Sequence, residues 1–147
     1  MSTFIGDFNA KMDIKQRVIL PAAFKHTLEE MGDLRLVAQK DIYEDCIRLV
    51  PYKTWEEDME MMRNKLNMFD RKHRQLMREF QMNTCELQLD TNGRILIPKK
   101  LTDLAHIDKE VNFLGLDRYI EIWSTETLNQ QPISTESLAE LAQEFLG

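Results

Sequence analysis

The sequence contains few of the residues on which metal centres, redox sites and nucleophilic catalysis depend. It has two cysteines, three histidines and five glycines. Cys46 and Cys85 stand at no metal-binding or redox spacing, the histidines are scattered, and no GxSxG or phosphate-binding glycine loop occurs. We therefore interpret the two cysteines as buried thiols. We expect no metal, no cofactor, no catalytic residue and no enzymatic reaction.

Long apolar runs are also missing. No segment approaches the roughly 20 apolar residues that cross a bilayer, and residues 1–20 lack the unbroken apolar stretch of a secretory signal peptide. The content of 43% hydrophobic and 8% aromatic residues is typical of a globular chain. These features predict a cytoplasmic protein with no membrane partner.

Positive charge is scarce overall but locally concentrated. The formal net charge of −6 argues mildly against nucleic acid, although a phosphate backbone responds to charges within about one Debye length, roughly 10 Å. Two segments are basic against a single acid each: residues 11–25, with Lys11, Lys15, Arg17 and Lys25, and residues 63–78, with Arg63, Lys65, Arg71, Lys72, Arg74 and Arg78. An acidic chain can therefore still present a basic face.

One nine-residue motif occurs twice, 77 residues apart, as 13-DIKQRVILP-21 and 90-DTNGRILIP-98. Each copy begins with Asp, has Arg four residues later, continues with three branched apolar residues and ends with Pro. Alternating apolar residues before each motif and the branched run after its Arg predict two strands. Each motif is therefore predicted to form the tip of a β-hairpin. Pro21 and Pro98 then end the strand and suit the first turn of a helix.

The segments that follow the two motifs also correspond. After a short helix, two further strands are predicted in each half, at 34–38 and 46–50 in the first and at 111–116 and 119–123 in the second. The chain is therefore expected to be α+β. We assign residues 1–53 to a first unit, 54–82 to a helical connector, 83–130 to a second unit and 131–147 to a C-terminal helix.

The connector has an apolar stripe, which we interpret as core packing. It runs from Trp55 to Phe69 at alternating steps of four and three residues. A break is expected near residues 67–70, where Asp70 could cap a second helix. The C-terminal amphipathic helix is predicted to begin near Ser134.

The duplicated motif, its spacing and the helical segment between the copies resemble the MraZ family of bacterial transcriptional regulators. The likeness covers residues 1 to about 130, is most specific in 86-ELQLDTNGRILIP-98 and includes 70-DRKHRQLMREF-80. The last fifteen or so residues show no family signature.

This resemblance implies two homologous swapped-hairpin units of the AbrB type in a pseudo-twofold arrangement. It also implies a ring-like homo-oligomer that binds double-stranded promoter DNA in the nucleoid. The target would be short repeats upstream of the gene cluster for cell division and cell wall synthesis, the chain's own operon.

For DNA contact, the resemblance points to Lys15 and Arg17, with Arg94 at the matching position. An arginine in such a turn either bonds the local Asp and carbonyls or offers its planar fork to phosphate or guanine. The basic neighbours Lys11 and Lys15 favour DNA for Arg17. The lack of such neighbours favours a structural or subunit-interface role for Arg94.

The other motif residues are expected to build the turns. Asp13 and Asp90 suit this role because an Asp carboxylate accepts backbone N–H groups two residues on, and Gly93, Pro21 and Pro98 are assigned to the same structural role. The first copy has Gln16 where the family generally has Gly. If the turn requires a left-handed backbone, Gln16 would cost roughly 1–2 kcal/mol.

The second basic segment, with Arg71, Lys72, Arg74 and Arg78, allows three interpretations: a solvated helix face, ion pairs with a neighbouring subunit, or DNA contact. For the whole chain, the alternative to a DNA-binding regulator is a protein-interaction or antitoxin-like assembly module of the same fold.

Overall fold

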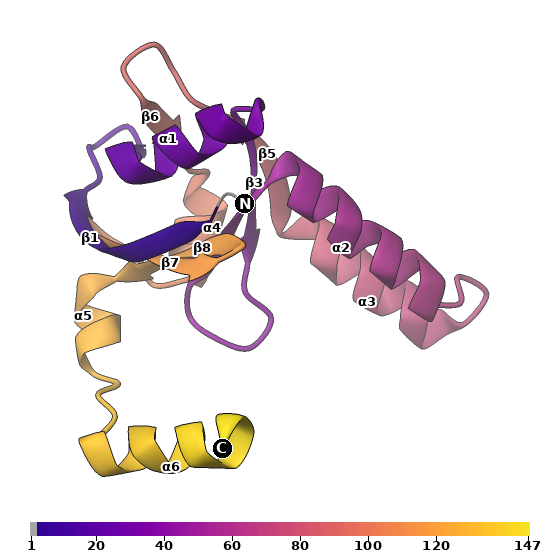
Figure 1. Cartoon of the computed structure of the whole chain (residues 1–147). Coiled ribbons are helices and arrows are strands. Elements are labelled where there is room, and N and C mark those ends of the chain that lie inside the picture. The colour runs from indigo at the N-terminus through magenta and orange to yellow at the C-terminus, as the bar shows by residue number, and fades with distance from the viewer. Residues whose placement is uncertain (1–2) are drawn as a thin grey trace.

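The computed structural model describes residues 3–147, and within them it shows an α+β fold, as expected (Figure 1). The strands are β1 (Phe4–Lys11), β2 (Arg17–Ile19), β3 (Arg35–Lys40), β4 (Ile47–Pro51), β5 (Thr84–Gln88), β6 (Arg94–Leu96), β7 (Glu110–Asp117) and β8 (Tyr119–Ser124). The helices are α1 (Ala22–Met31), α2 (Tyr52–Lys65), α3 (Arg71–Met82), α4 (Lys99–Leu104), α5 (Thr125–Asn129) and α6 (Thr135–Leu146). In the described residues no helix is long and apolar enough to cross a membrane.

The strands of the two sequence halves share one antiparallel sheet. Its order is β1-β7-β8-β4-β3-β5, and β2 pairs with β6 in a separate two-stranded ladder. In the sequence repeat, β1 corresponds to β5, β3 to β7 and β4 to β8. When each strand is replaced by its counterpart, the order of the large sheet becomes β5-β3-β4-β8-β7-β1, which is the same order read in reverse. The sequence repeat is therefore also a repeat in strand order.

The expected hairpins are wrong in one respect. The turns at Asp13 and Asp90 are present, but the strands on either side pair with the other half instead of with each other: β1 with β7, β5 with β3, and β2 with β6. In the β2–β6 ladder Val18 lies opposite Ile95, and both are almost fully buried. Burying each side chain is worth roughly 1.5–3 kcal/mol, a gain that requires both halves together.

The core is enclosed by the large sheet, the β2–β6 ladder and helices α1 and α4. Phe24 of α1 packs edge-to-face against Phe4 at 5.5 Å and Phe8 at 5.2 Å between ring centroids, a geometry that aromatic pairs favour. Helix α1 begins directly after Pro21 and ends at Gly32, which has the left-handed backbone common at helix ends. Helix α4 begins after Pro98 in the same way and buries Leu101.

The connector forms two helices that project from the body (Figure 1). Asp70 caps α3 as predicted, because its carboxylate accepts the N–H groups of Lys72 at 2.8 Å and His73 at 3.3 Å. The interpretation of the apolar stripe as core is right for Met59, which is buried, and wrong for Phe69, which is 98% exposed. Within the described residues, α3 buries none of its side chains.

Helix α6 begins where the sequence predicts. The Ser134 side chain accepts the N–H of Ser137 at 3.0 Å and caps the helix. Every residue from 131 to 147 is exposed, including the apolar side chains of α6.

Candidate nucleic-acid interface

The first motif folds into a turn that is held by the carboxylate of Asp13. Its Oδ1 accepts the backbone N–H groups of Lys15 and Arg17, both at 2.9 Å, and its Oδ2 accepts Nε–H of Arg17 at 3.0 Å. The backbone closes the turn through Asp13 N–H to Arg17 O at 2.8 Å and Gln16 N–H to Asp13 O at 3.1 Å. These donors, led by the Arg17 N–H, hold the pKa of Asp13 below its ordinary value.

The second motif repeats this geometry. Asp90 accepts the N–H groups of Asn92 at 2.8 Å and Arg94 at 2.9 Å, and it accepts Arg94 Nε–H at 2.9 Å. The Arg94 N–H is also the main cause of the lowered pKa of Asp90. Two copies of the motif, 77 residues apart, therefore build the same local structure from the same residue types.

Each arginine uses only part of its guanidinium group inside its turn. Nε faces the Asp in both copies, and the Arg17 and Arg94 side chains are 31% and 27% exposed. Within residues 3–147 their two terminal nitrogens donate no hydrogen bond. Because the bond to Asp fixes Nε, it also orients the plane of the guanidinium group. The N–H groups on the two terminal nitrogens remain available to a ligand.

The two turns flank the short β2–β6 ladder, and each is joined by a backbone bond to the end of the other motif's strand. Ile97 N–H donates to Gln16 O at 2.9 Å, and Leu20 N–H donates to Gly93 O at 3.0 Å. These bonds extend the short β2–β6 ladder to the turns themselves. Because the ladder is antiparallel, with Arg17 opposite Leu96 and Ile19 opposite Arg94, the Arg17 turn and the Arg94 turn lie at its two opposite ends, three residues of strand apart.

The two turns differ at one position. Gln16 and Gly93 both have a left-handed backbone, with φ of 66° and 75°. A Cβ on Gly93 would meet no atom within 4 Å, so the backbone angle alone favours glycine there. Gln16 has no such freedom, but its side-chain amide donates to Thr102 Oγ1 at 2.9 Å and to Ile97 O at 3.2 Å.

Those two bonds offset the strain at Gln16, because a hydrogen bond contributes roughly 0.5–1.5 kcal/mol and a left-handed residue costs about 1–2 kcal/mol. Thr102 is buried on α4 and was not expected to take part. In the sequence, the one feature that could indicate this role is the Thr102 hydroxyl within the short amphipathic helix.

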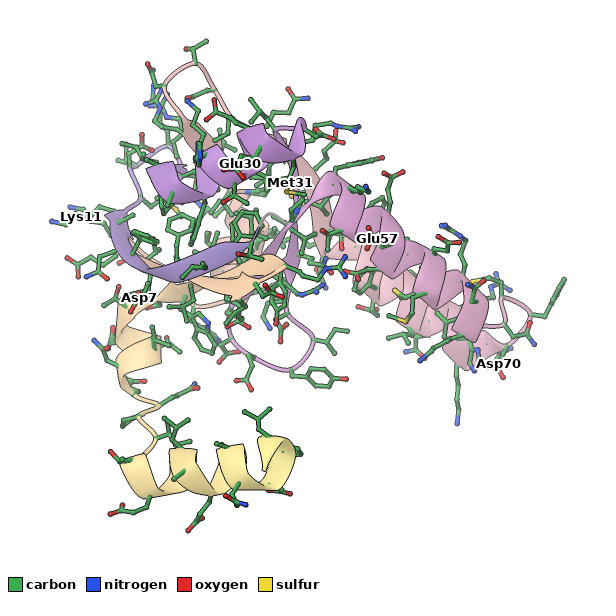
Figure 2. The ribbon with its side chains drawn as sticks, viewed as in Figure 1. Asp7, Lys11, Glu30, Met31, Glu57 and Asp70 are labelled. Atoms are coloured by element: carbon green, nitrogen blue, oxygen red, sulfur yellow. The ribbon has the colours of Figure 1, made fainter. Side chains whose placement is uncertain are left out.

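The basic residues separate into two locations. Lys11 and Lys15 are exposed beside the first turn, and Lys11 also lines a cavity of about 670 Å³ together with Gln16 and Lys109. Figure 2 shows Lys11 at the outer end of β1 and Asp70, which begins α3, at the far tip of the projecting helices. Arg71, Lys72, Arg74 and Arg78 of α3 are exposed, and the structure does not bring them to the turns.

One grouping of metal-ligating residue types escaped the sequence analysis. The ligand atoms of Asp41, Cys46 and Glu121 all lie within 4.8 Å of one another. Burial, followed by the two nearby carboxylates, raises the pKa of the Cys46 thiol, which keeps it protonated and a weak ligand at neutral pH. Cys46 is buried, as expected, whereas Cys85 is only partly buried.

Comparison with known proteins gives the same family as the motifs. The chain is 40% identical over 144 residues to the transcriptional regulator MraZ of Phocaeicola vulgatus, covering 98% of this chain and 94% of that protein. The MraZ regulator of Bacteroides thetaiotaomicron is 34% identical over 147 residues, with 100% and 94% coverage. The chain belongs to the MraZ family.

A more distant MraZ regulator, from Clostridium acetobutylicum, is 33% identical over 145 residues, with 97% and 98% coverage. The family model for the MraZ protein, with an antitoxin-like description, matches residues 80–145. The expectation that the last fifteen residues lack a family signature was therefore wrong, because the match extends through α6. MraZ is a family of transcriptional regulators, not of enzymes.

Proposed function

We propose that this chain is a sequence-specific transcriptional regulator that binds double-stranded promoter DNA with its two Asp–Arg turns. The observation that carries the proposal is the reciprocal pair of bonds, Ile97 N–H to Gln16 O and Leu20 N–H to Gly93 O, which ties the Arg17 turn and the Arg94 turn to the two ends of one short β2–β6 ladder. The names of the MraZ relatives support the same function.

The chemistry of the turns suits this role. Arg17 and Arg94 would offer their terminal nitrogens to a phosphate or to the O6 and N7 acceptors of guanine. Lys11 and Lys15 would contact phosphates, which fix position but do not read sequence. The Asp13 and Asp90 carboxylates already accept three hydrogen bonds each, so their role is to orient the arginines.

We also propose that the two halves form AbrB-type swapped-hairpin units related by a pseudo-twofold axis. The support is the strand order, which reads the same in reverse when the halves are exchanged, and the pairing of β2 with β6. On this proposal the units occupy residues 1–53 and 83–130, with the connector at 54–82 and the C-terminal helix at 131–147.

A ring-like homo-oligomer would explain how a chain with net charge −6 holds DNA. Each copy contributes a few contacts, and a ring that spans successive repeats multiplies weak affinities through effective concentration. The proposed targets are repeats upstream of the cell division and cell wall cluster, the chain's own operon, and the proposed site of action is the nucleoid in the cytoplasm.

The second candidate is a protein-interaction or antitoxin-like module. Two observations favour it: the antitoxin-like description of the family model and the uncovered apolar side chains of α6. The two functions differ in their response to salt, because phosphate contacts release counterions and protein contacts largely do not.

A gel-shift series with the chain's own upstream DNA and a scrambled duplex, at two salt concentrations, tests the regulator. We expect a shift of the upstream DNA at low salt that weakens steeply as salt rises. Absence of a shift at low salt, with the protein in its oligomeric form, would exclude the regulator and leave the interaction module.

A further inference from the structure

The outward face of the β2–β6 ladder combines the two motif arginines with two aliphatic side chains. The central residue of each strand is buried, so the residues on either side of it point outward. They are Arg17 and Ile19 on β2, and Arg94 and Leu96 on β6. Ile19 is 62% exposed and Leu96 is 53% exposed. The face therefore presents two cationic and two apolar groups in one direction.

The strand register places each aliphatic side chain beside an arginine. Arg17 lies opposite Leu96, and Ile19 lies opposite Arg94. Opposite side chains in an antiparallel pair have Cβ atoms roughly 4.5–5.5 Å apart, and diagonal neighbours such as Ile19 and Leu96 are roughly 7–8 Å apart. Base pairs stack about 3.4 Å apart. The two aliphatic side chains therefore span about two to three base pairs.

A two-stranded ribbon of this size suits the major groove of DNA. Its two backbones are roughly 4.8 Å apart, and the major groove, about 12 Å wide, admits a two-stranded ribbon. In Figure 1, β6 lies at the top of the body, away from α6 and from the outer ends of α2 and α3. A duplex can therefore approach the ladder without meeting those helices.

Charge around the ladder favours nucleic acid as the ligand of this face. Residues 11–21 and 90–100 each contain three basic residues against one acid, and that acid is bonded to the arginine of its own motif. The next acid along the chain, Asp103, pairs with Lys99 at 3.2 Å. Asp108 shares the cavity beside the first turn with two lysines. The local balance is positive although the whole chain is acidic.

Thymine is the base whose edge offers an apolar group to such a face. In the major groove thymine presents a methyl group at C5, which apolar side chains contact, whereas arginine pairs with O6 and N7 of guanine. A single exposed isoleucine is ordinary. Here the exposed aliphatic residue occurs in both motifs, two positions after the arginine, and lies opposite the other motif's arginine.

We propose that Ile19 and Leu96 contact thymine methyl groups in the major groove, beside the groups that Arg17 and Arg94 bind. The inference rests on the proposed DNA binding and names two further residues that set its sequence preference. Each contact should favour thymine over uracil about fourfold, because burying one methyl is worth roughly 0.8 kcal/mol and 1.4 kcal/mol is tenfold.

Deoxyuridine in place of thymidine tests this contact without changing the protein. Uracil lacks the C5 methyl and keeps the O4 acceptor. By fluorescence anisotropy at low salt, wild-type protein should bind its own upstream DNA about fourfold more weakly, or worse, when every thymidine is replaced. Equal affinity for the two duplexes overturns the inference and leaves the proposed DNA binding intact. Failure to bind either duplex overturns the proposed function, and the inference with it.

A protein variant assigns the methyl contact to these two residues. Ile19→Ser with Leu96→Ser removes both apolar side chains from the exposed face, so this double variant should bind the thymidine and deoxyuridine duplexes equally. The matched control is Phe69→Ser, which removes an exposed apolar side chain at the connector tip and should keep the wild-type ratio of affinities. A wild-type ratio in the double variant would mean that other residues contact the methyl groups, and it overturns the inference.

Molar mass distinguishes DNA contact from a subunit interface at the same face. In multi-angle light scattering without DNA, the double Ser variant should have the wild-type mass. A lower mass would mean that copies of the chain meet through Ile19 and Leu96, and it overturns the inference.

Single deoxyuridine substitutions along the upstream DNA then locate the contacts. Because the two side chains span about two to three base pairs, the sensitive thymines of one repeat should lie within about three base pairs of each other. Sensitive thymines separated by half a helical turn, about five base pairs, overturn the inference.

Discussion

The side-chain amide of Gln16 donates a hydrogen bond to the hydroxyl of Thr102 over 2.9 Å, across 86 residues of sequence. The bond ties the first Asp–Arg turn to helix α4 of the second half. The second turn has Gly93 at the matching position and therefore no such tie. The two turns have the same backbone conformation, but only the first is tied to α4 by a side-chain hydrogen bond.

Removal of this tie should destabilise the protein. Thr102→Val keeps the shape of the side chain but removes the hydroxyl acceptor, and we expect a loss of roughly 1–2 kcal/mol in the free energy of unfolding in urea. A double-mutant cycle with Gln16→Ala should show a coupling of about 1 kcal/mol. Additive effects of the two substitutions would show that the bond does not contribute.

The left-handed backbone at Gly93 predicts a purely conformational penalty. Gly93→Ala should lower the free energy of unfolding by about 1–2 kcal/mol, because φ is 75° and an added Cβ meets no atom within 4 Å. Gly93→Asn is the matched control, since Asn tolerates this conformation better. Equal stability of Gly93→Ala and wild type would mean that the turn relaxes to another conformation.

Arg17→Ala should weaken promoter binding by roughly 1–3 kcal/mol and leave the oligomer intact. The physical reason is the loss of the two terminal guanidinium nitrogens and their N–H donors, which Asp13 orients by holding Nε. Arg17→Lys keeps the charge without the fork and should recover phosphate binding but not preference for the promoter sequence. Fluorescence anisotropy with labelled promoter and scrambled DNA measures both, and a variant that loses its assembly as well would make Arg17 structural.

The pKa values of Asp13 and Asp90 lie below their ordinary value of 3.8. This direction determines how the stability of the fold changes in acid. The ionised form of each carboxylate is stabilised more in the folded state than in the unfolded state. Their contribution to stability is therefore complete above the unfolded pKa and is lost as pH falls through the lower folded pKa.

Urea unfolding at pH 7, 4 and 3 should show this loss in the wild type. The double variant Asp13→Asn with Asp90→Asn lacks both carboxylates, so its stability should fall less over the same pH interval. Parallel curves for the two proteins would assign the acid sensitivity to other groups.

Local features of this fold could be predicted from the sequence because their causes are local. Asp13 and Asp90 begin their turns, and Asp70 and Ser134 cap their helices, through bonds to residues at most four positions away. Strand pairing was missed because a two-residue period shows which face is buried but not which strand lies alongside. Nothing within 13–21 indicates that β2 pairs with β6.

The site itself was predictable only in part. The arginines and their basic neighbours follow from the repeated motif, whereas the anchoring of Gln16 depends on Thr102, which only the folded chain brings near. The exposure of Phe69 was missed for a related reason. An apolar stripe predicts that a helix packs on something, but it does not show how far the partner surface extends.

The most direct test of the proposed function is promoter binding by the double variant Arg17→Ala with Arg94→Ala, measured by anisotropy over a series of salt concentrations. We predict that the variant keeps the wild-type oligomer mass, loses its preference for promoter over scrambled DNA, and shows a shallower salt dependence. Promoter affinity and salt dependence equal to those of the wild type would contradict the assignment of the two turns as the DNA-binding site.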